Sequence, residues 1–468
     1  MLLFAFVSTC GLIHSGRLGA SDQVQSRLGL RGDEREEIKR IDIAIIGGGP
    51  CGLATALALR QEPCLRDASI AIFERDYLEP KGAAIILKPL GVNALNAIDR
   101  RLVRDMRRNM VHRFDSVDLT ADDVAESDLD SSGLPADFVQ PYRKRALPER
   151  LGKWFFRLLS RLSLRKSVPI YRWHGVRNIL AKRVLDICGP ATLRLGHTLV
   201  AIRNHRASDG VDLVFAVKPA TGEDSPQADA SSVTYRARLV CAADGVRSPT
   251  RRYWPGADTA TNTPQGRSLW YGLARLRLDD GIVRSVRHDG RMVFVLPTVG
   301  SSGACFSCNA PEISGYAKDC ADAKARCLSS MPRELWPTVL PILNATPHIY
   351  ETKLWSRDFS RPWQSPSKRL CFVGDAAHPM WATFGYGTSV GFEDAIALAR
   401  VARNAGSLGS FIDKGVRTFE AARLDRVRPV VEINREAALR QMAGAGRAET
   451  GALARKLEQI LEDTRIDE

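Results

Sequence analysis

Residues 41–59, IDIAIIGGGPCGLATALAL, decide the fold of this 468-residue chain. The first six residues are mostly apolar and β-branched, which is typical of a buried parallel strand. Gly47, Gly49 and Gly52 follow as a G-x-G-x-x-G turn, and the residues after them are strong helix formers. In such a turn the first glycine permits the bend, the second lets a pyrophosphate approach, and the third lets helix and strand pack closely. The helix N-terminus offers unpaired N–H groups to the phosphates.

A second apolar run, residues 69–73, ends in Glu74. An acid about twenty residues past the last glycine of such a turn accepts hydrogen bonds from a dinucleotide ribose. The order of strand, glycine turn, helix, strand and acid therefore predicts a dinucleotide site. NAD and FAD both fit these residues.

Two later segments choose between the cofactors. Residues 237–252, ARLVCAADGVRSPTRR, run from a predicted strand into an Asp-Gly pair. Residues 369–395, RLCFVGDAAHPMWATFGYGTSVGFEDA, place Asp375 at a strand end and open a helix near Gly387. An aspartate there can bind polyol hydroxyls, and the helix N-terminus favours a developing negative charge such as that of a reduced flavin. These segments favour FAD.

The set of motifs resembles that of the single-component FAD-dependent monooxygenases, the para-hydroxybenzoate hydroxylase-like aromatic-ring hydroxylases. GGGPCGLATALAL resembles their FAD-binding turn, AADGVRS their shared FAD and NAD(P)H motif, and GDAAHP…GYG…EDA their ribityl-binding motif. YRWHGVRNIL (171–180) resembles their arginine-bearing helix start, and FEAARLDRVRP (419–429) is similar to their C-terminal arginine-rich helix. The resemblance covers most of residues 40–430.

The resemblance implies cofactor-binding roles for the matching positions. These are the pyrophosphate glycines Gly47, Gly49 and Gly52, the ribose acid Glu74, Arg172 for a phosphate or ring edge, Asp244, Gly245 and Arg247 for the cofactor surface, Asp375 for the ribityl chain, and Gly387 and Thr388 for the flavin O2 edge. No second G-x-G-x-x-G unit follows, so NAD(P)H is expected to bind transiently as a co-substrate.

The resemblance also implies a reaction. In that family NAD(P)H reduces the flavin, O₂ adds at C4a, and the hydroperoxide delivers one oxygen atom to an organic substrate. We therefore expect an FAD- and NAD(P)H-dependent monooxygenase that acts on an aromatic or isoprenoid-like small molecule. Two alternatives stay open: a related flavoprotein reductase or halogenase, and a flavin-bound interaction protein without turnover. The last is suggested by two departures from the family pattern, Ala382 in place of proline and Ser389 in place of asparagine.

Catalytic side chains are harder to assign. Tyr271, in the predicted strand SLWYGLARL, is the candidate general base toward a phenol, although it also fits an ordinary strand aromatic. Tyr386 is a second candidate, and His378 is expected to pack beneath the flavin. No metal site is expected, because Cys305 and Cys308 lie on a predicted strand that sends them to opposite faces.

The predicted fold class is α/β, with a Rossmann-like FAD-binding domain interleaved with an antiparallel β-sheet substrate domain, followed by C-terminal helices. The predicted boundaries are 1–39 for an N-terminal extension, 40–112, 165–258 and 366–405 for the FAD domain, 113–164 and 259–365 for the substrate domain, and 406–468 for the helices.

Charge and the less regular segments leave questions open. The chain has 67 Lys and Arg against 53 Asp and Glu, a net charge of +14, but no nucleic-acid-binding motif. The excess suits an enzyme that handles phosphate-bearing cofactors. Residues 1–30 are either a targeting segment or an extension, with the cytoplasm as the default location. Residues 150–168 form a basic amphipathic pattern that suits either peripheral membrane contact or a cover over the substrate domain.

Overall fold

The computed structural model describes residues 38–78, 84–107, 110–111, 116–120, 170–203, 210–218, 231–254, 262–276, 283–297, 303–357, 368–442 and 447–463. The possible targeting segment and the amphipathic residues 150–168 lie outside these ranges. Within them, no helix combines the length and apolar character needed to cross a bilayer.

The first sheet carries the glycine turn and has the strand order β7-β2-β1-β10-β9-β8, with β16 also paired to β10. Strands β7, β2, β1, β10 and β16 are parallel, whereas β9 is antiparallel to both β10 and β8. The strands are β1 (Lys39–Ile46), β2 (Ile70–Phe73), β7 (Leu193–Arg194), β8 (His197–Arg203), β9 (Val211–Val217), β10 (Ser231–Ala242) and β16 (Leu370–Phe372).

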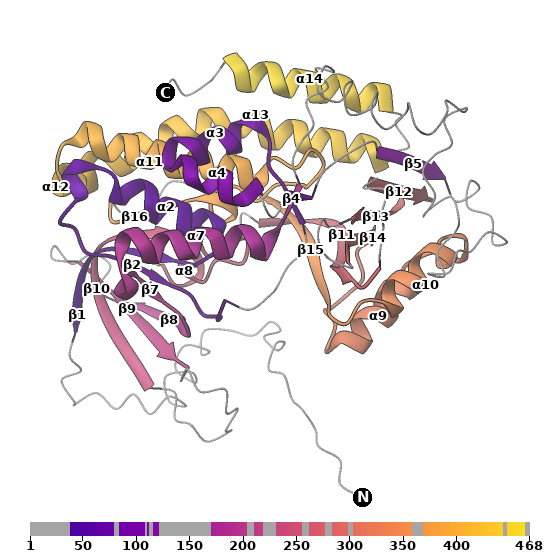
Figure 1. Cartoon of the computed structure of the whole chain (residues 1–468), viewed down its shortest axis with the longest axis horizontal. Coiled ribbons are helices and arrows are strands. Elements are labelled where there is room, and N and C mark those ends of the chain that lie inside the picture. Colours follow the sequence, from indigo (N-terminus) through magenta and orange to yellow (C-terminus); the bar gives the residue numbers. More distant parts are fainter. Residues whose placement is uncertain are drawn as a thin grey trace, which may run out of the picture.

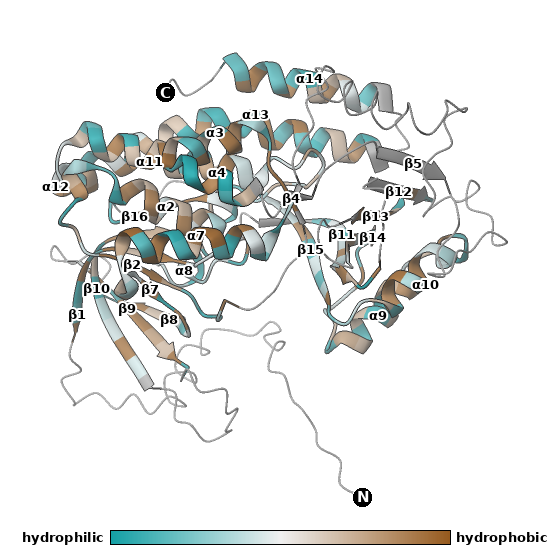
Figure 2. Ribbon diagram, viewed as in Figure 1, coloured by the Kyte–Doolittle hydropathy of each residue, from teal (hydrophilic) through white to brown (hydrophobic). Residues whose placement is uncertain are grey.

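Both faces of this sheet are covered because its strands alternate two sets of apolar side chains. In β1, Ile43 and Ile45 belong to a core shared with five helices, whereas Ala44 and Ile46 belong to a core shared with two C-terminal helices. The five helices are α2 (Pro50–Arg60), α3 (Pro89–Ile98), α4 (Arg100–Arg107), α7 (Trp173–Cys188) and α11 (Gly387–Ala405), and the C-terminal two are α13 (Val416–Met442) and α14 (Arg447–Asp463). In Figure 2, α7 and α14 alternate polar and apolar segments, as expected of helices with one buried side.

The second sheet has the strand order β15-β11-β14-β13-β12-β5 (Figure 1). It consists of β5 (Ser116–Thr120), β11 (Asn262–Ala274), β12 (Val283–His288), β13 (Arg291–Pro297), β14 (Ala304–Pro311) and β15 (Ile349–Arg357). The prediction of a purely antiparallel sheet is wrong at one edge, because β5 pairs in parallel with β12. Such an edge strand arrives from a distant part of the chain, so no hairpin constrains its direction.

Helices α9 (Cys320–Ser329) and α10 (Trp336–Asn344) cover one face of the second sheet, which buries Trp270 and Cys308 there. Cys305 lies instead in a small cluster on the opposite face, so the prediction that the two thiols diverge is confirmed. This opposite face, which we call the open face, presents Leu273, Phe294, Leu296 and Cys305 to Ile86 of the first domain.

Short elements complete the fold. A three-stranded sheet, β3-β6-β4, lies between the larger parts. The remaining elements are β3 (Ala84–Ile86), β4 (Met110–Val111), β6 (Ile170–Arg172), α8 (Pro249–Tyr253), α12 (Leu408–Ser410) and the single turns η1 (Pro63–Leu65), η3 (Pro190–Thr192), η4 (Arg333–Leu335), η5 (Gly374–Ala376) and η6 (Phe411–Gly415). The predicted α/β class with C-terminal helices is confirmed, and the domain boundaries stay a prediction.

Candidate active site

Three strand ends bring distant parts of the sequence together. Strand β10 is the parallel neighbour of both β1 and β16, so the segments after all three strands leave the sheet at the same edge. These segments begin with Gly47, Ala243 and Gly374. The carboxyl edge of a parallel sheet is where open α/β folds bind their ligands.

The glycine turn has the backbone that a pyrophosphate site needs. Gly47 has φ +107°, and a Cβ there would lie 2.5 Å from the Ala243 carbonyl oxygen. A Cβ on Gly52 would lie 2.1 Å from the Gly47 oxygen, so the turn and α2 touch at this point. Around Gly49, in contrast, no atom lies within 4 Å of the Cβ position, and no side-chain hydrogen bond caps the helix that starts at Pro50. The open space therefore faces bare helix N–H groups, as phosphate binding requires.

Glu74 is fixed beside this turn. Its carboxylate accepts hydrogen bonds from the N–H groups of Gly48 (2.7 Å) and Asp76 (2.9 Å) and lies 3.3 Å from the guanidinium of Arg177. Arg177 is buried and also donates from Nε to the Gly48 oxygen (2.9 Å). A carboxylate has about four acceptor sites, so Glu74 keeps capacity for a ribose hydroxyl.

The Asp-Gly pair after β10 lies directly against the glycine turn. The Asp244 Cα is 2.9 Å from the position of a Cβ on Gly47. The Asp244 carboxylate accepts from the Thr250 N–H (2.8 Å) at the start of α8, and burial raises its pKa. Gly245 has φ +80°, so its backbone conformation favours glycine.

The two arginines of this motif do different things. Arg247 is exposed and lies 4.4 Å from the ring centroid of Tyr316, on the loop after β14. Arg251 is buried, stacks 3.7 Å from the Phe372 centroid and donates to the Ala376 oxygen (3.0 Å). The structure thus brings Arg251 into the strand-end site and directs Arg247 toward the second sheet.

Asp375 and Gly387 come together at the third strand end. The Asp375 Oδ1 lies 4.0 Å from the Cβ position of Gly387, the first residue of α11, and Thr388 follows half-buried in its first turn. The Asp375 side chain is exposed although protein surrounds it, so it faces a hollow rather than the outer surface. Desolvation raises the pKa of Asp375, and the cations of His378 and Arg357 act in the opposite direction.

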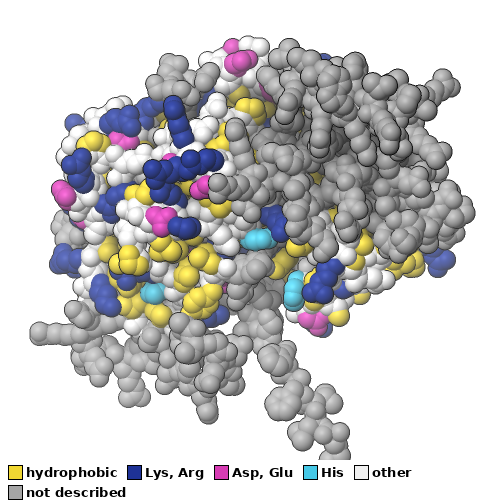
Figure 3. All heavy atoms as spheres, viewed as in Figure 1, with side chains coloured by type: hydrophobic (Ala, Val, Ile, Leu, Met, Phe, Trp, Pro, Cys, Tyr) yellow, Lys and Arg dark blue, Asp and Glu magenta, His cyan; other side chains and the backbone are white. Residues whose placement is uncertain are grey.

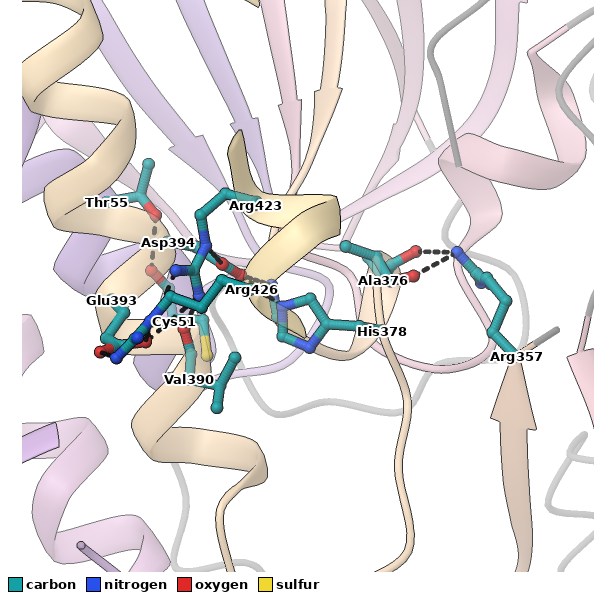
Figure 4. A network of polar contacts seen from close by, with 12 residues as sticks. Cys51, Thr55, Arg357, Ala376, His378, Val390, Glu393, Asp394, Arg423 and Arg426 are labelled. Atoms are coloured by element: carbon teal, nitrogen blue, oxygen red, sulfur yellow. Dashed lines mark hydrogen bonds and ion pairs between the residues drawn. The ribbon is translucent and has the colours of Figure 1, made fainter. Parts of the chain in front are cut away.

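A buried ionic network holds this turn from behind (Figure 4). His378 Nε2 lies 2.6 Å from Asp394 Oδ2, and the same oxygen accepts from the Gly374 N–H (2.8 Å). Arg423 of α13 donates from Nε to Asp394 Oδ1 (2.7 Å). Although burial opposes ionisation, His378 and Arg423 lower the pKa of Asp394. The position of His378, fully buried and bonded to Asp394, fits support of the turn better than proton transfer to a substrate.

The two departures from the family pattern differ in their surroundings. Ala382 is exposed. Ser389 is buried, its Oγ accepts from the Lys88 N–H (2.9 Å), and a Cβ on Gly91 would lie 2.6 Å from that Oγ. The small serine therefore permits close contact between α11 and α3. Tyr386, the second catalytic candidate, is buried under the Lys88 ammonium (4.9 Å to the ring centroid), and burial raises its pKa to about 12.

Arg172 lies toward the second sheet rather than the glycine turn. It ends β6, precedes α7, and acts electrostatically on Cys305 of the open face. Burial raises the pKa of the Cys305 thiol to about 12, and the Arg172 cation opposes this shift. The apolar open face and this cation thus share one region.

Tyr271 also belongs to the open face. It stands opposite Ser307 and Tyr350 in the sheet register, and its ring stacks on that of Tyr350 with centroids 5.6 Å apart. Burial raises the pKa of Tyr271, while Arg247 acts to lower it. The hydroxyl is therefore a hydrogen-bonding group at neutral pH rather than a ready base.

Sequence reasoning missed five arginine and aspartate side chains that build the site: Arg177, Arg251, Arg357, Asp394 and Arg423. A signal existed for Arg177, because Val176, Leu180 and Val184 share its buried helix face at helical spacing. The others depend on contacts between elements far apart in the sequence, which no local pattern reveals.

The strand-end geometry defines a dinucleotide-binding flavoprotein, and comparisons with known proteins agree. Residues 189–432, just over half of the chain, match the family described as FAD binding domain. The chain is similar to an FAD-dependent monooxygenase of Aspergillus terreus, with 23% identity over 420 residues, covering 85% of this chain and 86% of that protein. It is also similar to the 3-amino-4-hydroxybenzoate 2-monooxygenase of Streptomyces cremeus, with 26% identity over 413 residues, covering 85% and 86%.

Among solved structures, HpxO of Klebsiella pneumoniae in complex with FAD and uric acid has a TM-score of 0.56 and 21% identity, covering 90% of this chain and 95% of that one. This likeness concerns the fold. The chain belongs to the FAD-binding-domain family and is an FAD-dependent monooxygenase of the aromatic hydroxylase type.

Proposed function

We propose that the enzyme uses NAD(P)H and O₂ to insert one oxygen atom into an aromatic or isoprenoid-like small molecule. The observation that carries this proposal is the apolar contact between the two parts of the site. Ile86 packs with the open face and is also the side chain nearest to the Cβ position of Gly385, two residues before α11. An apolar substrate on the open face would therefore lie next to the loop that leads into α11.

The residues of the first sheet would hold FAD. Gly47, Gly49 and Gly52 would receive the pyrophosphate, and Glu74 the adenosine ribose. At the other end, Asp375 would bind the ribityl chain. When bound, the flavin would accept a hydride from NAD(P)H and activate O₂, and the protein would supply orientation and a dry chamber.

At the flavin ring, Gly387 and Thr388 would direct N–H groups at the O2 edge. The N-terminus of α11 carries a partial positive charge, which stabilises the negative charge of the reduced ring. Asp244 and Gly245, beside the glycine turn, would line the cofactor surface. Arg172 and Arg247 both lie toward the open face, so they would meet the outer edge of the cofactor or the substrate.

The open face would receive the substrate. Leu273, Phe294, Leu296 and Cys305 would exclude water and favour an apolar ring, since burial of apolar area is the main attraction in such a chamber. Tyr271 would place a hydroxyl beside the substrate and stays protonated at neutral pH, so it would orient a phenol by a hydrogen bond. The similarity to a 3-amino-4-hydroxybenzoate monooxygenase supports an aromatic substrate.

NAD(P)H is an anion, and the surface charge favours its approach. Helix α4 exposes Arg100, Arg101 and Arg104. Figure 3 shows Lys and Arg side chains gathered over the helices at the upper left of the molecule, where Asp and Glu are fewer. A positive field of this kind raises the encounter rate with an anionic co-substrate at low salt.

The decisive experiment combines three measurements on the purified chain. We expect a flavin absorbance spectrum, NAD(P)H oxidation that a panel of phenols and apolar polyenes stimulates, and one ¹⁸O atom from ¹⁸O₂ in the product. Flavin without stimulated NAD(P)H oxidation would favour a flavin-bound interaction protein. Substrate consumption with a reduced or halogenated product and no ¹⁸O would favour the rival enzyme classes.

A further inference from the structure

Two buried arginines hold the carbonyl groups of the turn that bears Asp375. The Ala376 oxygen accepts hydrogen bonds from Arg251 Nη2 (3.0 Å) and Arg357 Nη1 (2.9 Å). The Ala377 oxygen accepts from the same Nη1 of Arg357 (2.7 Å). Figure 4 shows Arg357 reaching these carbonyls from the end of a strand. The peptide planes next to Asp375 are therefore fixed by side chains from outside the turn.

The two arginines come from different parts of the fold. Arg251 belongs to α8, which follows β10 of the first sheet, and its guanidinium is also stacked on Phe372 of β16. Arg357 is the last residue of β15, at the edge of the second sheet, where it stands opposite Asn262 of β11. Arg357 thus connects the sheet with the open face directly to the turn of Asp375.

The link carries charge as well as position. Arg357 is buried, with 4% of its surface exposed, so its cation acts in a region of low dielectric constant. Burial raises the pKa of Asp375, whereas Arg357 is one of the two cations that lower it. Arg357 therefore favours the ionised carboxylate, which accepts hydroxyl hydrogen bonds more strongly than a protonated one does.

We propose that Arg357 is a positioning residue, through which the second sheet sets the orientation of Asp375 and hence the seat of the flavin. The proposal rests on FAD binding and not on the identity of the substrate. Because hydrogen bonds to charged groups contribute about 1.5–3 kcal/mol, removal of this guanidinium should weaken FAD binding about 10- to 100-fold.

The test compares three variants with the unchanged protein. Arg357→Met removes the charge and both hydrogen bonds, and Arg357→Lys keeps the charge. Arg326→Met is the matched control, since Arg326 of α9 binds Glu351 of the same strand through Nε (2.8 Å) on the face covered by helices. Each apoprotein is titrated with FAD to obtain Kd, and the visible circular dichroism of the bound flavin reports its surroundings. Thermal unfolding of each variant reports stability.

We expect Arg357→Met to raise the Kd for FAD at least about tenfold and to change the visible circular dichroism. Arg357→Lys should restore part of the affinity, and Arg326→Met should lower the thermal midpoint while Kd stays within about twofold of the unchanged protein, because its lost contact is remote from the turn. Equal FAD affinity and dichroism in Arg357→Met and the unchanged protein would overturn the proposal. So would an equal loss in the Arg326→Met control.

If Arg357→Met does not fold, Arg357→Gln, which retains donors for the two carbonyls, takes its place with the same expected outcome for the dichroism. These measurements need no turnover. A failure of the proposed function would leave FAD binding intact, whereas a failure of this inference would leave Kd unchanged.

Discussion

Replacing Arg423 with methionine should destabilise the fold strongly. Only 1% of the side chain is exposed, its Nε lies 2.7 Å from Asp394 Oδ1, and its Nη2 donates to the Val390 oxygen (3.2 Å). Removing one partner of a buried ion pair costs about 3–5 kcal/mol, because the other charge stays buried without compensation. Asp394 retains its bonds to His378 and Gly374, so we expect a loss near the lower limit, about 3 kcal/mol. This is about a 150-fold increase in the unfolding equilibrium constant.

The assay is equilibrium urea unfolding of the FAD-bound chain followed by far-ultraviolet circular dichroism. Arg440→Met is the control, because Arg440 lies on the same helix and its pair with Glu436 is exposed on both sides (49% and 43% of the side-chain surfaces). Exposed pairs contribute about 0–1 kcal/mol, so the control should lose less than about 1 kcal/mol. Similar small losses in both variants would refute the account of a buried network that supports the turn.

Three further predictions follow from the site. Gly52→Ala should lower the thermal midpoint sharply, since its Cβ would lie 2.1 Å from the Gly47 oxygen, whereas Gly49→Ala should leave the midpoint unchanged and weaken FAD binding, because its methyl group would occupy the open space at the helix start; FAD titration that finds equal affinity for Gly49→Ala contradicts this account. Asp394 has a lowered pKa, so its ionised carboxylate stabilises the fold above the ordinary value of 3.8, and this contribution is lost as the pH falls through the folded pKa. Asp394→Asn should therefore be less stable at pH 7 and show a weaker dependence on pH below about 4, which urea midpoints across pH 3–7 would check. Tyr271→Phe should keep its FAD affinity and lower phenol-stimulated NAD(P)H oxidation about tenfold through a lost hydrogen bond, with an unchanged pH profile up to pH 9 because burial raises the pKa of this tyrosine; equal rates would remove it from the substrate site.

The glycine turn could be predicted because its requirements are local. Gly47 and Gly52 are needed where the backbone must bend or where two segments touch, and the run of helix formers after them has no competing pattern. Glu74 followed from its distance along the chain, because a helix of ordinary length returns the chain to the neighbouring parallel strand. The fold class and the cofactor depended on such short-range features.

The support of the site could not be predicted in this way. Arg251 and Arg247 stand four residues apart in one motif, yet the first packs against Phe372 and the second meets Tyr316. Which of them reaches the flavin turn depends on the start of a five-residue helix, and no periodicity can be measured over so short a segment. The single parallel edge pair of β5 and β12 was missed for a similar reason, since strand direction depends on the path of the intervening chain.

The sequence by itself determined the turn, its acid and the cofactor, because backbone conformation and helix polarity are properties of neighbouring residues. Only the tertiary structure decided how Asp375 is held. Arg357 and Arg423 come from β15 and α13 and converge on one turn, where low dielectric constant makes their charges effective over short distances. Such convergence is a matter of packing, which joins residues that no spacing along the chain connects.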